Sequence, residues 1–244
     1  MIDMEPLRAN PLDRPIGLQL YTVGQELDQN FHGTLKRISE IGYREVELAQ
    51  THGKTAAQLR KAFKSSGLSC RSAHMFDPKQ SPQQFMDFAN ELGVKYVVTS
   101  FNPPPSVMAA MSGPNPDFAA IVQGVQKMTA DDYKKSAETA NLLGGEAKKR
   151  GMQYLYHNHN VEFKKLGDTT GYDILLSSTD PDLVKMELDC GWMTAAGHNP
   201  VAYLQKYPNR YRLLHIKAFK PGEPTFNLAG PGAPTPTELG KGVP

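Results

Sequence analysis

The stretch Gly151-Met152-Gln153-Tyr154-Leu155-Tyr156-His157-Asn158-His159-Asn160 joins an apolar-leaning run to four consecutive polar residues. It predicts a strand that ends in chemically active side chains. Because successive side chains of a strand alternate faces, His157 and His159 point the same way. One polar residue here would usually be a surface or satisfied core residue, but four in a row are costly to bury without partners. Two histidines on one side of a strand end can converge on a metal or on a sugar.

Strand and helix patterns alternate along the whole chain. We expect strands at 16–21, 43–48, 68–75, 96–100, 151–157, 184–189 and 211–217, and helices at 30–41, 55–66, 82–92, 131–149, 172–177 and 201–207. This alternation predicts βα units and a parallel sheet. Seven such units favour an α/β fold of the (β/α)8 TIM-barrel type. No eighth strand is visible beyond Lys217, so we expect a barrel that lacks its last strand and helix in this chain.

The length of the chain suits one barrel. Its 244 residues match the roughly 250 residues of a typical barrel. We expect an irregular leader over 1–14 and a single TIM-barrel-like domain over 15–244 that is incomplete at the C-terminus. The loop over 102–116 is rich in Pro, Met and Ser, and long irregular loops of this kind often cover a site, so it is a candidate lid.

Composition excludes several classes of protein. Lys and Arg total 27 against 25 for Asp and Glu, a formal charge of +2, so the basic surplus of a nucleic-acid binder is missing. Cys70 and Cys190 lie far apart, which fits buried free thiols in a reducing compartment. No run approaches the roughly 18 apolar residues of a membrane helix. We therefore expect a soluble cytoplasmic protein without a membrane or nucleic-acid partner, unless an export signal has been lost.

Polar residues gather at the predicted strand ends, where barrels of this kind carry their chemistry. These residues are Glu47, His74, His157, His159, Asp189, His215 and Lys217. Asp189 ends an apolar strand, so it is either a ligand or ion-pair partner or a cap on the next segment. Such mixed nitrogen and oxygen ligands suit a divalent metal ion.

Three further residues have two interpretations each. Lys217 could hold an anionic or oxo group of a substrate, or it could be a solvated surface residue. Trp192, the only tryptophan, could be a platform for a sugar ring or part of the packing. Glu187 shares the face of Asp189 one layer deeper, which favours a supporting role over direct ligation.

Several motifs together resemble the sugar phosphate isomerase/epimerase family, which belongs to the xylose isomerase-like TIM barrels. The motifs are Ile16–Thr22, Tyr156–His159 with Glu162-Phe163, Leu188–Trp192 and Leu214–Lys217. The resemblance implies one divalent metal ion, often Mn²⁺, with Zn²⁺, Co²⁺, Fe²⁺ or Mg²⁺ as alternatives. Its ligands here would be His157, Asp189 and His215. The family's fourth ligand is a Glu after a Gly-x-Gly segment, and the chain ends before it.

Roles are also expected for the remaining residues. His159 and Glu162 are the expected catalytic residues: His159 is the base, because the pKa of histidine is near neutral, or a substrate contact, and Glu162 contacts the substrate or supports a neighbouring residue. The residues expected to contact the substrate are Glu47, His74, Trp192 and Lys217. The well-known ketose epimerases have a Glu where this chain has His157, and the His-Asn-His form is more similar to members related to inosose dehydratases and to oxo-glycoside-cleaving proteins.

Three functions follow as hypotheses. The first is a metal-dependent sugar isomerase or epimerase that acts on a small carbohydrate. The second is a lyase or dehydratase that acts by elimination on a 3-oxo-sugar, an inosose or an oxo-glycoside. The third is a non-catalytic sugar-binding protein or a subunit of a complex. All three have a small-molecule carbohydrate as the partner, and all are compatible with a homo-oligomer.

Overall fold

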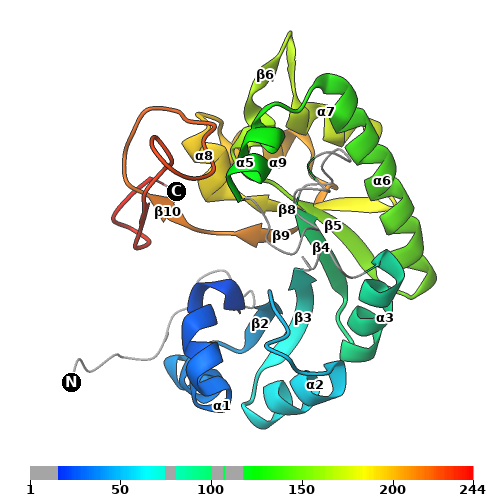
Figure 1. Cartoon of the computed structure of the whole chain (residues 1–244), viewed down its shortest axis with the longest axis vertical. Coiled ribbons are helices and arrows are strands. Elements are labelled where there is room, and N and C mark those ends of the chain that lie inside the picture. Colours follow the sequence, from blue (N-terminus) through cyan, green and yellow to red (C-terminus); the bar gives the residue numbers. More distant parts are fainter. Residues whose placement is uncertain (1–15, 75–80, 101–106, 108–117, 244) are drawn as a thin grey trace. The chain divides into compact units, whose positions relative to one another are not determined.

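The computed structural model describes residues 16–74, 81–100, 107 and 118–243 and divides into two compact units (Figure 1). The first unit comprises residues 1–98 and 150–152, and the second comprises 99–149 and 153–244. The expected leader and, apart from residue 107, the candidate lid lie outside the described residues. That residues 15–244 form a single domain stays a prediction.

The first unit is a layer of parallel strands with helices. Its strands run in the order β1-β2-β3-β4 and all pair in parallel. They are β1 (Gly17–Gln19), β2 (Glu45–Leu48), β3 (Ser69–His74) and β4 (Tyr96–Ser100), which crosses into the second unit. Their helices are the 3-10 turn η1 (Leu20–Val23), α1 (Gly24–Ile41), α2 (Ala56–Ser65) and α3 (Pro82–Leu92).

Local sequence explains where these helices begin. Thr55 and Ser81 form capping boxes with Gln58 and Gln84, so their side chains satisfy the first free N–H groups of α2 and α3. Helix α1 begins six residues before the expected start at Asn30. Asn30 has non-helical φ and ψ angles, and its Oδ1 atom accepts a hydrogen bond from the Gly33 N–H, so it caps the second part of a kinked helix.

The second unit also alternates strands with helices. Its main strands, β5 (Gln153–His157), β8 (Val184–Asp189) and β9 (Tyr211–His215), pair in parallel. Its helices are α5 (Phe118–Gln126), α6 (Ala130–Lys149), α7 (Gly171–Ser178), α8 (Cys190–Ala195), α9 (Pro200–Lys206) and the 3-10 turn η2 (Val161–Phe163). Two small antiparallel pairs are β6 (Lys165–Leu166) with β7 (Thr169–Thr170) and β10 (Ala218–Phe219) with β11 (Pro236–Thr237).

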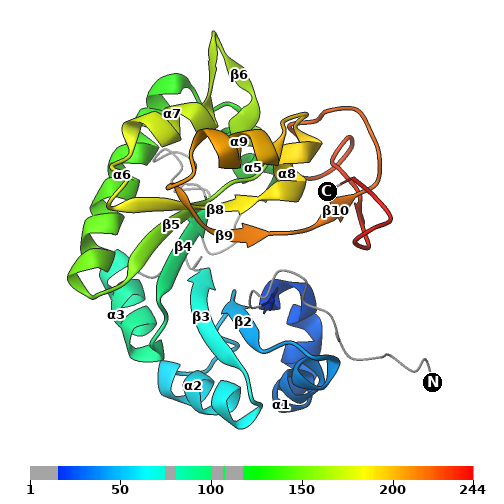
Figure 2. The ribbon, with the colours of Figure 1, turned by 180° about the vertical axis from the view of Figure 1, so that it is seen from behind.

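The core of the second unit lies around β8 and the face of α6. Every residue of β8 is buried, and α6 packs against β5 and α7 (Figure 2). At Gly144 an added Cβ would lie 2.6 Å from the Leu183 carbonyl oxygen, so glycine is what allows α6 to approach the chain there. None of the helices in the described ranges is long and apolar enough to cross a membrane.

The expected strand pattern is largely confirmed. All seven strands form, and β4 and β8 have the expected bounds. Helices α5 and α8 were not expected. Among the described residues after β9, up to 243, no further parallel strand occurs. Cys70 and Cys190 are free thiols, as expected, although Cys190 begins a helix instead of ending a strand.

Candidate metal centre and active site

The carboxyl ends of β5, β8 and β9 bring three expected metal ligands together. Strand register pairs His157 with Glu187 and Asp189 with His215. Each of His157, Asp189 and His215 offers one ligand atom, and these atoms all lie within 4.8 Å of one another. The Oδ2 atom of Asp189 lies 3.7 Å from Nε2 of His157 and 3.8 Å from Nδ1 of His215.

The two oxygen atoms of Asp189 have different partners. Oδ1 accepts a hydrogen bond from the Trp192 N–H at 2.8 Å and so caps α8, while Oδ2 lies 2.8 Å from Nζ of Lys217. Both interpretations of Asp189, as a cap and as an ion-pair partner, therefore hold. Burial raises the pKa of Asp189, and the Lys217 ammonium opposes that rise.

Glu187 contacts the imidazoles of both His157 and His215. It is fully buried, and its Oε2 atom lies 2.9 Å from Nδ1 of His157 and 3.4 Å from Nε2 of His215. The bond to Nδ1 leaves Nε2 of His157 to face Asp189. A carboxylate that holds the far nitrogen of a histidine is the usual arrangement behind a metal ligand.

This set of side chains fits a divalent metal ion. Ligand atoms about 2.1 Å from such an ion lie roughly 3–4 Å apart, close to the distances between Asp189 and the two imidazoles. Glu187 and Asp189 are both fully buried, and Asp189 forms an ion pair with Lys217. A cation held by His157, Asp189 and His215 would add a further favourable interaction with the Asp189 carboxylate.

Two asparagines anchor the segment that carries the histidines. The side chain of Asn158 donates to the Asp189 carbonyl at 3.2 Å and accepts from the Asp189 N–H at 3.0 Å, which extends the pairing of β5 with β8 beyond the strand ends. Asn160 donates to the carbonyls of Thr225 and Asn227. Both asparagines are fully buried. Sequence reasoning missed these roles, although the alternation of histidine and asparagine indicates two faces.

His159 lies next to the expected metal ligands. Its ring centroid is 5.0 Å from that of His157 and 5.4 Å from that of Trp192, and it is partly exposed. The Nζ atom of Lys217 lies 5.4 Å from the centroid of the Trp192 ring. Lys217 follows the end of β9, yet it reaches Asp189 because Gly191 has no side chain: an added Cβ would lie 2.3 Å from Cγ of Lys217.

Glu162 is turned into the protein. It is fully buried; its Oε1 atom accepts from the Tyr156 hydroxyl at 3.1 Å and its Oε2 atom from the His159 N–H at 3.0 Å. Burial raises the pKa of Glu162 to about 7, and the hydrogen bonds from Tyr156 and His159 partly oppose that rise.

Glu47 and His74 belong to the first unit. They lie at the carboxyl-terminal ends of the neighbouring strands β2 and β3, and Glu47 is buried while His74 is partly exposed. Their role as substrate contacts stays a prediction. His52 lies in the same unit, where only 5% of its side chain is exposed and its Nδ1 atom lies 2.7 Å from Oδ1 of Asp28.

The chain is similar in sequence to known proteins. A family model described as "Xylose isomerase-like TIM barrel" matches residues 35–243, which confirms the expected fold class. The chain is 28% identical over 199 residues to an inosose dehydratase from Clostridium beijerinckii; the match covers 78% of this chain and only 64% of that relative's length.

Solved structures show the same fold. A sugar phosphate isomerase/epimerase from Parabacteroides distasonis is 26% identical, with a TM-score of 0.69 and coverage of 86% of this chain and 80% of that one. The IolI protein, solved with a zinc atom, is 16% identical, with a TM-score of 0.59 and coverage of 86% and 75%.

Proposed function

Because the chain belongs to the xylose isomerase-like TIM barrel family, we propose that it is an enzyme that acts on a small oxo-carbohydrate with the help of one divalent metal ion. The convergence of His157, Asp189 and His215 carries this proposal. Glu187 would hold the imidazole of His157 in the orientation that presents Nε2. The candidate ions are Mn²⁺, Zn²⁺ and the other divalent ions of this class.

The chain's own residues supply proton transfer and substrate contacts in this proposal. A bound divalent ion would polarise a carbonyl or hydroxyl oxygen of the substrate. His159 removes the proton from the carbon beside that oxygen, since its partly exposed imidazole lies beside His157. Trp192 offers an apolar face to the carbon ring, and Lys217 donates a hydrogen bond to a substrate oxygen.

Elimination of water from an oxo-polyol is the reaction we propose. The relative from Clostridium beijerinckii named above is an inosose dehydratase. By the resemblance drawn from the sequence, His157 stands where the ketose epimerases have a glutamate. Elimination needs one base for the C–H proton and one acid for the departing hydroxyl. In this proposal His159 is the base and Lys217 is the acid. This reverses the order of the two hypotheses drawn from the sequence.

Isomerisation or epimerisation remains the second candidate. Its support is the structural likeness to the sugar phosphate isomerase/epimerase at 26% identity. Proton removal by His159 is common to both reactions. They differ in whether the proton returns to carbon or the neighbouring hydroxyl departs.

The two reactions separate in deuterated water. We would incubate the Mn²⁺-loaded protein with an inosose and follow the products by mass spectrometry. Elimination predicts a product lighter by one water, with turnover lowered at least about 100-fold in His159→Gln; His32→Gln, at an exposed histidine, is the matched control. Deuterium uptake without loss of water would favour the isomerase, and neither change would favour sugar binding alone.

A further inference from the structure

We propose that Glu162 is a positioning residue that holds the backbone of His159, and that it does not exchange a proton with the substrate. This inference rests on the proposed role of His159 as the base. The sequence left two roles open for Glu162, contact with the substrate and support of a neighbouring residue, and this inference selects the second and names His159 as the residue supported. The hydrogen bonds and the burial of Glu162 support this role.

Both carboxylate oxygens of Glu162 are engaged within the protein. Oε2 accepts from the His159 N–H and Oε1 accepts from the Tyr156 hydroxyl. The side chain therefore bridges Tyr156, which precedes His157, and His159, which lies two residues after it. The 3-10 turn η2 brings the carboxylate back under its own segment, and the Phe163 N–H donates to the Asn160 carbonyl within that turn. The His159 backbone is therefore held by a side chain three residues later.

No surface of Glu162 is open to a substrate. The residue is fully buried, whereas His159 is partly exposed. A group that transfers a proton to substrate must come within hydrogen-bond reach of it, and a buried carboxylate with both oxygens bonded cannot do so without a rearrangement. This position fits a residue that supports the base better than a residue that itself acts as an acid or a base.

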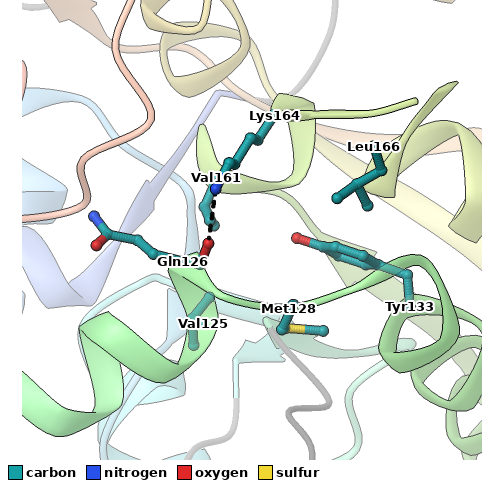
Figure 3. Close-up of a pocket in the computed structure, with 7 residues that line it drawn as sticks. All are labelled: Val125, Gln126, Met128, Tyr133, Val161, Lys164 and Leu166. Atoms are coloured by element: carbon teal, nitrogen blue, oxygen red, sulfur yellow. Dashed lines mark hydrogen bonds between the residues drawn. The ribbon is translucent and has the colours of Figure 1, made fainter. Parts of the chain in front are cut away.

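The η2 turn forms part of the wall of a small pocket. Val161 lines this pocket together with Val125, Met128 and Tyr133, and Lys164 donates from Nζ to the Gln126 carbonyl at 3.3 Å (Figure 3). Neither Glu162 nor His159 lines the pocket, so it gives a substrate no access to the Glu162 carboxylate.

The hydrogen bonds indicate which substitution should be tolerated. In Glu162→Gln the amide oxygen can accept from the His159 N–H while the amide group donates to the Tyr156 hydroxyl, which can also accept. Glu162→Ala removes both bonds. A positioning role therefore predicts rescue by glutamine, and a proton-transfer role predicts that the two variants are equally impaired.

The first measurement is the position of the His159 ring without any substrate. Histidine labelled with ¹³C at Cε1 gives one NMR signal per histidine, and His159→Gln identifies that of His159. We expect a single sharp signal in the wild type and in Glu162→Gln, and a shifted, broadened or split signal in Glu162→Ala. Glu138→Ala, at an exposed glutamate of α6, is the matched control. An unchanged His159 signal in a folded Glu162→Ala variant would overturn the proposal.

The second measurement is turnover of the inosose by the Mn²⁺-loaded protein. We expect kcat to fall on the order of 100-fold in Glu162→Ala, with KM changed less than about threefold. Glu162→Gln should recover kcat to within about threefold and keep the wild-type pH profile. Loss of kcat in Glu162→Gln equal to that in Glu162→Ala would refute positioning. If the wild type itself has no turnover, the proposed function fails, and the NMR result alone decides the role of Glu162.

Discussion

Nδ1 of His157 lies 2.9 Å from Oε2 of Glu187, and this contact determines which nitrogen of His157 faces the candidate metal centre. With Nδ1 engaged by Glu187, Nε2 faces Asp189. The same Glu187 oxygen lies 3.4 Å from His215. One buried carboxylate thus orients two of the three proposed ligands, and it offers the first test of the centre.

Removing the charge of Glu187 should weaken metal binding. In Glu187→Gln the imidazoles lose their anionic partner, so we expect the Kd for Zn²⁺ to rise about 10- to 100-fold, as measured by isothermal titration calorimetry. Glu223→Gln, at an exposed position in the same unit, should bind as the wild type does. Equal affinities in the Glu187 variant and the wild type would contradict the supporting role.

Asp189 should be required for the metal itself. The variant Asp189→Asn keeps an oxygen that can cap α8 through the Trp192 N–H but loses the negative charge. Elemental analysis after dialysis against Mn²⁺ or Zn²⁺ should find about one ion per wild-type chain and less than a tenth of that in Asp189→Asn. Retention of a full equivalent by the variant would place the metal elsewhere.

Gly191 should be essential for the position of Lys217. An alanine there would place its Cβ 2.3 Å from Cγ and 2.9 Å from the carbonyl oxygen of Lys217. We expect Gly191→Ala to lower the free energy of unfolding by about 1–3 kcal/mol in urea titrations. Gly145→Ala is the control: nothing lies within 4 Å of its added Cβ, and alanine should stabilise α6 by up to about 1 kcal/mol. Equal stabilities would show that the loop moves aside freely.

Stability of the metal-free protein should depend on pH through Glu162. Burial raises its pKa from 4.5 to about 7, so the folded state binds the proton more tightly than the unfolded state does. Its contribution to stability is complete below about pH 4.5 and is lost as the pH rises toward 7.

The matching variant isolates this effect. Glutamine does not ionise, so the stability of Glu162→Gln relative to the wild type should increase by roughly 3 kcal/mol between pH 4.5 and pH 8. Urea denaturation across this range measures the difference. Parallel stability curves would mean that the pKa of Glu162 is not raised in the folded protein.

Much of the fold and the candidate site could be predicted from the sequence. Alternating periods of two and 3.6 residues located the main strands and most helices, because burial of one face imposes those periods. The rule that chemistry lies at strand ends gave a wider set of polar residues. The family resemblance selected His157, Asp189 and His215 from that set, and these three converge in the structure. Helices α5 and α8 were not predicted. The sequence before α5 is irregular in pattern, and α8 begins directly at the end of β8.

Only the tertiary structure decided which polar group meets which. The sequence by itself determined that polar side chains stand at the ends of β5, β8 and β9. It could not show that Asn158 bonds to the Asp189 backbone, that Lys217 reaches Asp189 past Gly191, or that Glu162 turns inward to His159. The physical reason is that alternation gives the face of each side chain, whereas strand register and close backbone approach select the partner of a buried polar atom.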